Sequence, residues 1–271
     1  MSAETAGQAR GAALLASCVA AADDAAAFIR QRAAASASLE WHVKAHSDFV
    51  SEVDTGAEGI IRDALLARVP DARVLGEELS PGAALDADTL FVVDPLDGTT
   101  NFLHGYPEYA VSIAAVAGGV PVAAVVTNVP SGERFTATLG GGAFRDGAPI
   151  AVSRIVDPTR ALIGTGIPFR DTGDLPRYLR QLDAVCRATA GVRRAGAAAL
   201  DLCDVACGRF EAFWELSLAP WDFTAAALIV REAGGRTATV DGAPLPLAHS
   251  SVLAGSPAMF AWLGDVVRAA R

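Results

Sequence analysis

The chain has 271 residues, of which 52% are hydrophobic and 20% are charged, and its formal net charge is −9. These values exclude an intrinsically disordered chain, and the length suffices for one large domain or two closely packed ones. The negative charge argues against nucleic acid or an anionic membrane as a partner. An anionic substrate would then need a locally positive site, which a bound metal ion can provide.

The first predicted element is a helix around the apolar segment "GAALLASCVAAA" at 11–22. The segment is similar to the hydrophobic part of a secretory signal, but Glu4 precedes it and two aspartates follow it. Apolar residues also continue at helical spacing beyond it, at Leu15, Val19, Ala22, Ala26 and Ile29. We therefore expect an amphipathic helix that packs on the core, with no membrane anchor.

A second helix is predicted by Thr55 and Glu58, whose spacing is that of a capping box. It would begin at this pair and carry the apolar residues Ile60, Ile61, Leu65 and Leu66. Asp54 would then lie immediately outside the N-terminus of the helix.

The middle of the chain predicts strands. Short apolar runs at 73–75 and 90–93 are each followed by acidic residues. The uncharged segment 109–130 is as long as a membrane span, but Gly118 and Gly119 at its centre predict a hairpin of two buried strands. Asp146-Gly147 predicts another tight turn. Residues 1–152 thus form an α+β half with a mostly antiparallel sheet.

Residues 153–271 predict an α/β half. A strand in 161–169 precedes a helix over 175–189, and a further helix starts near Gly196. A strand at 211–216 precedes a helix that opens at Asp222 and closes at Gly234-Gly235. No linker separates the halves, so we expect one compact unit with an extensive interface between them.

Four cysteines are present, and none forms a CxxC pair. Cys203 and Cys207 have the spacing of one helix face, but no further zinc ligands accompany them. We expect reduced cysteines that fill apolar space in a cytoplasmic protein.

Two aspartates follow the strand at 90–93, in the stretch "LFVVDPLDGTTNF". Asp94 and Asp97 would repel each other at the end of a buried strand, and desolvation adds to that cost. A turn at Asp94-Pro95 is the ordinary interpretation. A bound cation is the alternative, because it removes the repulsion.

Other carboxylates also lie at the ends of predicted elements, and each has an ordinary interpretation. Asp222 can cap a helix, Glu77 can lie in a solvated turn, and Asp54 can interact with a helix dipole. Together they form an oxygen-only ligand set, which favours Mg²⁺ or Mn²⁺ over Zn²⁺. Paired metal ions recur in phosphoryl transfer, and the backbone at Gly98-Thr99-Thr100 is suited to binding a phosphate.

These motifs resemble those of the inositol monophosphatase family, which belongs to the lithium-sensitive, magnesium-dependent phosphatases. The resemblance covers nearly the whole chain and rests on "VKAHSDFVSEVD" at 43–54, "GEE" at 76–78, "DPLDGTTNF" at 94–102, "RRAGAAALDL" at 193–202, "FWE" at 213–215 and "PWD" at 220–222.

The resemblance implies a set of metal ligands, namely Glu77, Asp94, the Leu96 carbonyl, Asp97, the Thr99 hydroxyl and Asp222. They would hold two or three Mg²⁺ ions, with Mn²⁺ as a possible substitute. Asp54 and Thr99, with Glu77 as a further catalytic residue, would activate the attacking water.

The resemblance also implies a substrate-binding set, consisting of Asp97, Gly98, Thr99, Ala197, Glu215 and Asp222. Gly98 and Thr99 amides would bind the phosphate, while Glu215, Ala197 and Asp97 would face substrate hydroxyl groups. The family often has a hydroxyl residue at the position of Ala197, so this departure bears on polyol preference. "DGTTNF" favours the inositol phosphatase branch over the bisphosphate nucleotidases.

The family fold is a layered α/β/α/β/α sandwich of the inositol monophosphatase and fructose-1,6-bisphosphatase type, and its usual assembly is a homodimer. The expected substrate is inositol monophosphate or a related polyol or sugar phosphate. Histidinol phosphate and nucleotide bisphosphates remain alternatives within the superfamily. A phosphatase-like regulatory or interaction protein is a further alternative.

A phosphatase class with a nucleophilic aspartate has the motif Asp-x-Asp-Gly-Thr, which "DPLDGTT" approaches. Its spacing differs by one residue, and Pro95 stands where the first aspartate would be. No cysteine or histidine lies in the motifs, so we expect direct attack by water and no phosphoenzyme.

Overall fold

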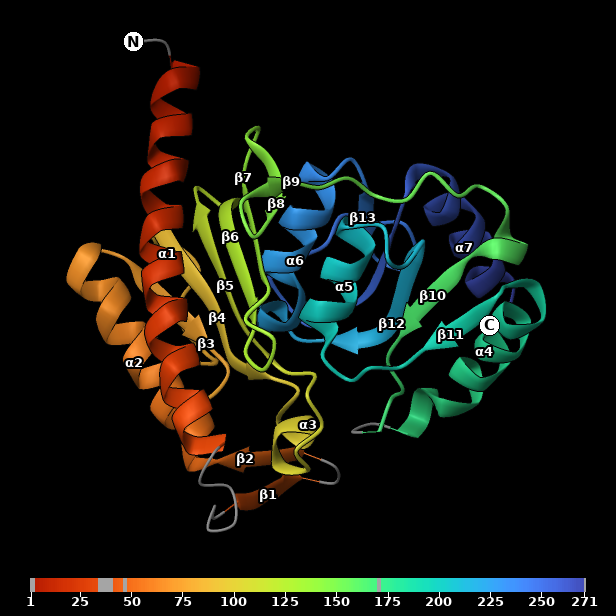
Figure 1. Ribbon diagram of the computed structural model, residues 1–271, viewed down its shortest axis with the longest axis horizontal. Coiled ribbons are helices and arrows are strands. Elements are labelled where there is room, and N and C mark those ends of the chain that lie inside the picture. The colour runs from red at the N-terminus through yellow and green to blue at the C-terminus, as the bar shows by residue number, and fades with distance from the viewer. Residues whose placement is uncertain (1–2, 34–40, 46–47, 170–171, 271) are drawn as a thin grey trace.

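The computed structural model describes residues 3–33, 41–45, 48–169 and 172–270. Within these residues, two large β-sheets alternate with three layers of helices (Figure 1). Helices α1 and α2 cover the outer face of one sheet, α5 and α6 lie between the sheets, and α4 and α7 cover the outer face of the other. The expected α/β/α/β/α sandwich is therefore confirmed.

The larger sheet has the strand order β3-β4-β5-β6-β7-β8-β9, and only its β3–β4 pair is parallel among the described strands. Its strands are β3 (Arg73–Gly76), β4 (Thr89–Asp97), β5 (Ala110–Ala117), β6 (Val120–Asn128), β7 (Arg134–Thr138), β8 (Gly142–Arg145) and β9 (Ala148–Pro149). The hairpin predicted at 109–129 and the tight turn predicted at Asp146-Gly147 are both present.

The smaller sheet has the order β11-β10-β12-β14-β13. Its strands are β10 (Leu162–Thr165), β11 (Gly191–Arg193), β12 (Ala212–Leu218), β13 (Arg236–Ala238) and β14 (Ser250–Gly255). A separate hairpin consists of β1 (Trp41–Ala45) and β2 (Asp48–Ser51).

The helices are α1 (Ala3–Ala33), α2 (Glu52–Arg68), α3 (Thr99–Leu103), α4 (Leu175–Ala188), α5 (Ala198–Ala206), α6 (Pro220–Glu232) and α7 (Pro257–Ala269). Short 3₁₀ turns lie at Pro158–Arg160 and Thr172–Asp174.

Strand β4 shows why the sheet is buried on both faces. Leu90 and Val92 pack toward α5 and α6, whereas Phe91 and Val93 pack toward α1 and α2. Successive side chains of a strand point to opposite faces, so a continuous apolar run satisfies two cores at once. The larger sheet ends at Pro149 and the smaller one begins at Leu162. We propose that the chain divides between them, at residues 152 and 153.

Helix α1 confirms the first predicted helix, and it buries Ala22, Ala26 and Ile29 of the predicted face. Its core residues are Leu14, Cys18, Ala21, Ala22, Ala25, Ala26 and Ile29. Leu15 and Val19 are only partly buried, because α1 packs on α2 and the larger sheet through its alanines. Among the described helices, the part of α1 at Arg10–Ala33 is long and apolar enough to cross a membrane. Core helices of globular proteins can have the same length and composition, and α1 contributes buried residues to the core.

The start of α2 differs from the prediction. The helix begins at Glu52, so Asp54 lies inside its first turn and not outside it. Glu58 does not form a capping box, since its carboxylate accepts hydrogen bonds from the N–H groups of Glu78 and Leu79. A partner that lies about twenty residues away in the chain thus overrides the local signal of Thr55 and Glu58.

Helix α6 begins at Pro220, two residues before the predicted start. Proline suits the first helical position because its missing N–H would have no partner there. Asp222 lies in the first turn, where its Oδ2 accepts a hydrogen bond from the Ala219 N–H at 2.7 Å. The predicted helix end is confirmed by Gly234, which follows α6 with a φ of +86°.

The cysteines are all free. Cys18 and Cys203 are buried in the core, Cys207 is partly buried, and Cys186 is exposed. Cys207 follows the last residue of α5, so the two cysteines predicted to share one helix face do not both belong to the helix.

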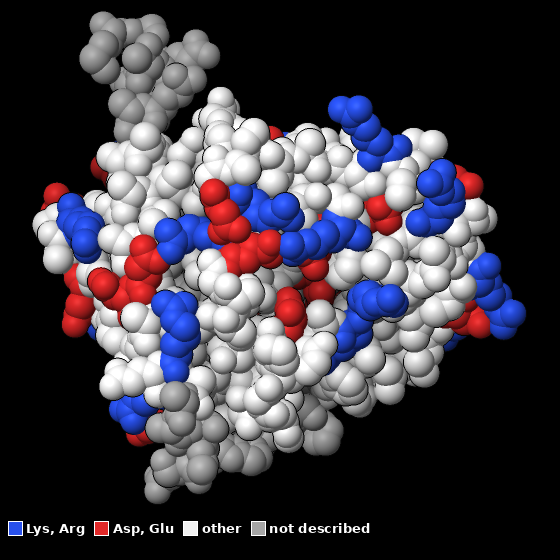
Figure 2. All heavy atoms as spheres, viewed as in Figure 1, with Lys and Arg blue, Asp and Glu red and all other residues white. Residues whose placement is uncertain are grey.

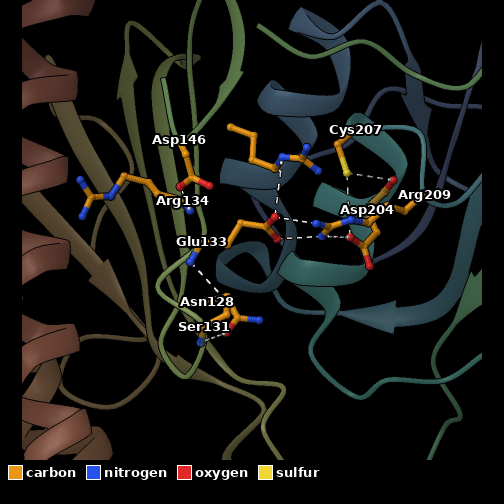
Figure 3. A network of polar contacts seen from close by, with 9 residues as sticks. Asn128, Ser131, Glu133, Arg134, Asp146, Asp204, Cys207 and Arg209 are labelled. Carbon is orange, nitrogen blue, oxygen red and sulfur yellow. Dashed lines mark hydrogen bonds and ion pairs between the residues drawn. The ribbon is translucent and has the colours of Figure 1, made fainter. Parts of the chain in front are cut away.

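An ion-pair network connects the turn between β6 and β7 to α5 and the segment that follows it (Figure 3). Arg209, which follows α5, donates to both carboxylate oxygens of Glu133, at 2.7 and 2.5 Å. The same guanidinium donates to Asp204 Oδ1 at 2.9 Å. Because Glu133 lies between β6 and β7, the network links the larger sheet to the layer that contains α5.

Candidate active site

A cavity of about 530 Å³ lies where the larger sheet, the smaller sheet and the helices between them meet. The predicted site residues that line it are Glu77, Asp94, Leu96, Asp97, Gly98, Thr99, Ala197, Glu215 and Asp222. Asp54 does not line the cavity but contacts Thr99, which does. The structure therefore brings the whole predicted set together.

A bulge in β4 turns both aspartates toward the cavity. Asp94 pairs with Ser112 of β5 and Asp97 pairs with Ala110, so β4 contains one extra residue between them. Side chains three residues apart in a regular strand point to opposite faces, and one extra residue restores the same face. Pro95 occupies the bulge, where its missing N–H breaks no regular pairing.

Glu77 joins the aspartates because β3 and β4 are parallel. Gly76, the last residue of β3, pairs with Val93, the residue before Asp94. The carboxyl ends of these neighbouring strands lie at the same edge of the sheet, so Glu77 and Asp94 both reach the cavity.

The electrostatics of Asp94 reflect this crowding. Burial raises the pKa of its carboxyl well above the usual value, and the nearby charges of Glu77, Asp97 and Asp222 raise it further. The donor set fits Mg²⁺ or Mn²⁺ by its chemistry, since hard cations prefer carboxylate and carbonyl oxygens. As the described side chains lie, no three His, Cys, Asp or Glu groups form a finished metal site. The fit thus rests on donor type and charge and not on coordination geometry.

Gly98 is required by its backbone and its surroundings. Its φ is +92°, and a Cβ there would lie 2.9 Å from the Glu108 carbonyl oxygen and 3.3 Å from the Ala197 Cβ. Glycine alone adopts this conformation at little cost. Ala197 is fully buried against this position, so a larger side chain at residue 197 would have to displace the backbone at Gly98.

Thr99 is the first residue of α3, and it connects the cavity to α2. Its hydroxyl lies 2.9 Å from Asp54 Oδ1 and 3.1 Å from the Leu96 carbonyl oxygen. The hydroxyl has one hydrogen to donate, which leaves its oxygen able to accept from a molecule in the cavity. Asp54 is 1% exposed and does not line the cavity, so Thr99 connects it to the cavity.

Asp97 also binds the start of α5. Its Oδ2 accepts a hydrogen bond from the Ala199 N–H at 2.7 Å. A carboxylate stabilises the N-terminus of a helix through both this bond and the helix dipole. Asp97 thus fixes the position of Ala197 and Ala198 relative to β4.

The far side of the cavity is formed by the smaller sheet. Glu215 on β12 faces Gly166, where a Cβ would lie 2.0 Å from its carboxyl carbon. Gly166 therefore leaves the space that the Glu215 carboxylate occupies. Arg194 stacks over the ring of Phe169 at 5.1 Å, and both residues line the same side.

Sequence reasoning missed several residues that line the cavity, namely Thr165, Phe169, Asp174, Arg194, Asp201, Ser217 and His249. Asp201 is 2% exposed, and burial raises the pKa of its carboxyl, with Glu215 and Asp97 adding to the effect. It follows Ala197 by four residues in a predicted helix, a spacing that places both on one face. That spacing was the available signal.

Two bacterial proteins are similar to this chain over most of its length. The chain is 42% identical over 231 residues to an inositol-1-monophosphatase of Rhizobium meliloti, covering 85% of this chain and 87% of the relative. It is 45% identical over 217 residues to the Nus factor SuhB of Pseudomonas aeruginosa, covering 79% and 80% of the two chains.

A solved structure has the same fold. The extragenic suppressor protein suhB of Bartonella henselae superimposes with a TM-score of 0.89 at 36% identity, covering 94% of this chain and 98% of that one. The model of the inositol monophosphatase family matches residues 12–270. The fold, the grouping of acidic residues at the cavity and this match together establish that the chain belongs to the inositol monophosphatase family.

Proposed function

We propose that the protein is a Mg²⁺-dependent phosphomonoesterase that hydrolyses inositol monophosphate or a related polyol or sugar phosphate. The observation that carries the proposal is the convergence of Glu77, Asp94, Asp97 and Asp222 on one cavity beside Gly98 and Thr99. A family relative named inositol-1-monophosphatase supports the substrate class.

We assign the metal-binding role to Glu77, Asp94, Asp97 and Asp222, with the Leu96 carbonyl and the Thr99 hydroxyl as further oxygen donors. Bound Mg²⁺ would supply positive charge for the phosphate and lower the pKa of an attacking water. Asp94 Oδ1 already accepts the Leu96 N–H at 2.9 Å. This bond fixes the orientation of the carboxylate at the bulge.

The proton of the attacking water passes to Asp54 through the Thr99 hydroxyl. Thr99 donates its hydrogen to Asp54 while its oxygen accepts from the water, so one hydrogen-bonded chain connects water and base. This arrangement uses no side-chain nucleophile. The reaction should therefore invert the configuration at phosphorus, and net retention with a chiral thiophosphate substrate would refute direct attack.

The phosphate and the polyol bind at opposite sides of the cavity. The backbone N–H groups of Gly98 and Thr99 at the start of α3 bind the phosphate, and the left-handed conformation of Gly98 sets their direction. The Glu215 carboxylate accepts hydrogen bonds from substrate hydroxyl groups, and backbone groups near Ala197 accept from or donate to them.

Phosphate release from a panel of phosphomonoesters tests the proposal. The panel contains inositol monophosphates, glycerol phosphate, a hexose phosphate, histidinol phosphate and a nucleotide bisphosphate, each with Mg²⁺, with Mn²⁺ and in excess chelator. We expect polyol phosphates to be hydrolysed fastest and chelator to abolish activity. Full activity in chelator contradicts the metal assignment, and preference for histidinol phosphate or a bisphosphate selects an alternative substrate within the superfamily.

An interaction role is a second candidate, because one relative is named as a Nus factor. The predicted acidic set at this cavity is complete, which favours catalysis whether or not such a role exists. On the face seen in Figure 2, acidic and basic side chains are interspersed and form no broad basic patch. This face therefore does not present the broad basic surface that is typical of nucleic-acid binding. We also propose a homodimer, which sedimentation analysis would test.

A further inference from the structure

We infer that Glu58 is a positioning residue that holds the loop after β3, and with it Glu77, in place for metal binding. This inference rests on the proposed function, because Glu77 is a ligand only if the cavity binds metal. Glu58 does not line the cavity, and it acts through the backbone of the loop.

The contact is formed by a fully buried carboxylate and two backbone donors. Glu58 is 0% exposed. Its Oε2 accepts the Glu78 N–H at 2.6 Å, and its Oε1 accepts the Leu79 N–H at 3.0 Å. Hydrogen bonds to an ionised acceptor are stronger than neutral ones. The peptide group that contains the Glu78 nitrogen also contains the Glu77 carbonyl, so this bond fixes the backbone on the C-terminal side of Glu77.

Gly76 makes the contact possible. A Cβ at Gly76 would lie 2.1 Å from Glu58 Oε1 and 2.5 Å from the carboxyl carbon. The Glu58 carboxylate thus occupies the space that a side chain at Gly76 would need. The backbone of Gly76 is not in the left-handed region that favours glycine. The space taken by Glu58 therefore explains why the "GEE" motif has a glycine here.

Helix α2 places Glu58 and Asp54 on one face, one turn apart. Its buried residues are Val53, Asp54, Ala57, Glu58, Ile61 and Leu65, which follow helical spacing. Asp54 contacts Thr99, and Glu58 holds the loop of Glu77. One rigid helix face therefore sets the distance between the base and a ligand, although neither α2 residue lines the cavity.

Two substitutions perturb the contact from opposite sides. Glu58→Gln keeps the shape but turns one acceptor into an amide donor, which faces a backbone N–H and loses that bond. Gly76→Ala replaces no acidic residue but displaces the Glu58 carboxylate. The matched controls are Glu211→Gln and Gly59→Ala. Glu211 is 3% exposed and accepts the Leu162 N–H at 2.6 Å away from the cavity, and a Cβ at Gly59 meets nothing within 4 Å.

The first measurement is hydrogen exchange of the 77–79 amides in metal-free protein. We expect exchange to accelerate about tenfold in Glu58→Gln and Gly76→Ala, as the loss of one charge-assisted bond implies. Neither control should change it. Unchanged exchange in both test variants would refute the contact's role, and the Gly76→Ala result decides the matter if Glu58→Gln fails to fold.

The second measurement is a Mg²⁺ titration by calorimetry, with hydrolysis measured at saturating Mg²⁺. We expect Glu58→Gln and Gly76→Ala to raise the half-saturating Mg²⁺ concentration roughly tenfold, while the rate at saturation stays within about threefold of wild type. An equal shift in Glu211→Gln would mean that lost stability, and not positioning, causes the effect. A wild type that binds no Mg²⁺ would refute the proposed function, and the metal-positioning claim with it, whereas the exchange data would still test the loop contact.

Discussion

Asp54→Asn tests the proposed proton path most directly. The Thr99 hydroxyl lies 2.9 Å from Asp54 Oδ1, and Asp54 is 1% exposed. Asparagine has nearly the same shape and keeps an oxygen that can accept this hydrogen bond, but it does not act as a base at neutral pH. The substitution therefore removes proton transfer and preserves the geometry.

The expected size of the effect follows from the role. General-base assistance contributes about 10²–10⁴ in rate, so kcat should fall by roughly that factor. KM and Mg²⁺ affinity should change little, because Asp54 does not line the cavity. Thr99→Ala should cost a comparable amount. The double variant should lose less than the product of the two single losses, because the residues act as one unit.

Initial rates of phosphate release at saturating Mg²⁺ measure these effects, and circular dichroism checks that each variant is folded. Thr99→Ser retains the hydroxyl and should stay within about tenfold of wild type. Asp63→Asn replaces an exposed aspartate on the same helix and is the control for charge. An Asp54→Asn enzyme within threefold of wild type, or fully multiplicative losses in the double variant, would refute the relay.

Gly98→Ala should lower the free energy of unfolding by roughly 2–3 kcal/mol, because the backbone is left-handed and the Glu108 carbonyl oxygen is close to the added Cβ. This corresponds to a decrease in Tm of about 4–12 °C. Calorimetry measures it, and Gly105→Ala, which has positive φ in open space, should lose less. Asp94→Asn should abolish turnover in the rate assay yet leave metal-free protein at least as stable as wild type at pH 7, because burial and neighbouring carboxylates raise the pKa of Asp94 and disfavour its charged form. A lower Tm for Asp94→Asn than for wild type, both measured in excess chelator, would contradict this expectation. Lithium at roughly tens of millimolar should inhibit, as weak hard-cation binding at an open site allows; undiminished rates would argue against the lithium-sensitive branch. Arg209→Gln should lower Tm by about 2–4 °C, because it removes the ion pair with Glu133. The Arg209 side chain is 44% exposed and the Glu133 side chain 20% exposed. High salt should remove most of that difference.

The layers and the acidic motifs could be predicted because local sequence encodes them. The apolar run of β4 is continuous, which is typical of a strand buried on both faces. The motifs predicted that Asp94 and Asp97 act together, but the local pattern did not predict the bulge that puts both on one face. Their shared face depends on the register with β5 and on that bulge, and only Pro95 hinted at an irregularity.

A long-range contact accounts for the error at the start of α2, and a neighbouring proline accounts for the one at the start of α6. Thr55 and Glu58 have a capping spacing, but Glu58 finds stronger partners in the loop after β3. Asp222 lies inside α6 because Pro220 begins the helix. The sequence thus indicated that Glu58 and Asp222 matter. Their positions in the helices depended on the loop after β3 for Glu58 and on Pro220 for Asp222.

The cavity wall is divided between two parts of the chain. Residues 94–100 belong to the larger sheet and its α3 extension, whereas residues 165–169, 194–198 and 215–219 come from the smaller sheet and α5. A protein engineer can therefore randomise the second group without replacing the acidic residues of the first, provided that Ala197, which packs against Gly98, is kept. Libraries confined to that wall should yield enzymes with new substrates and an inherited reaction, which is also a route by which gene duplicates could diverge.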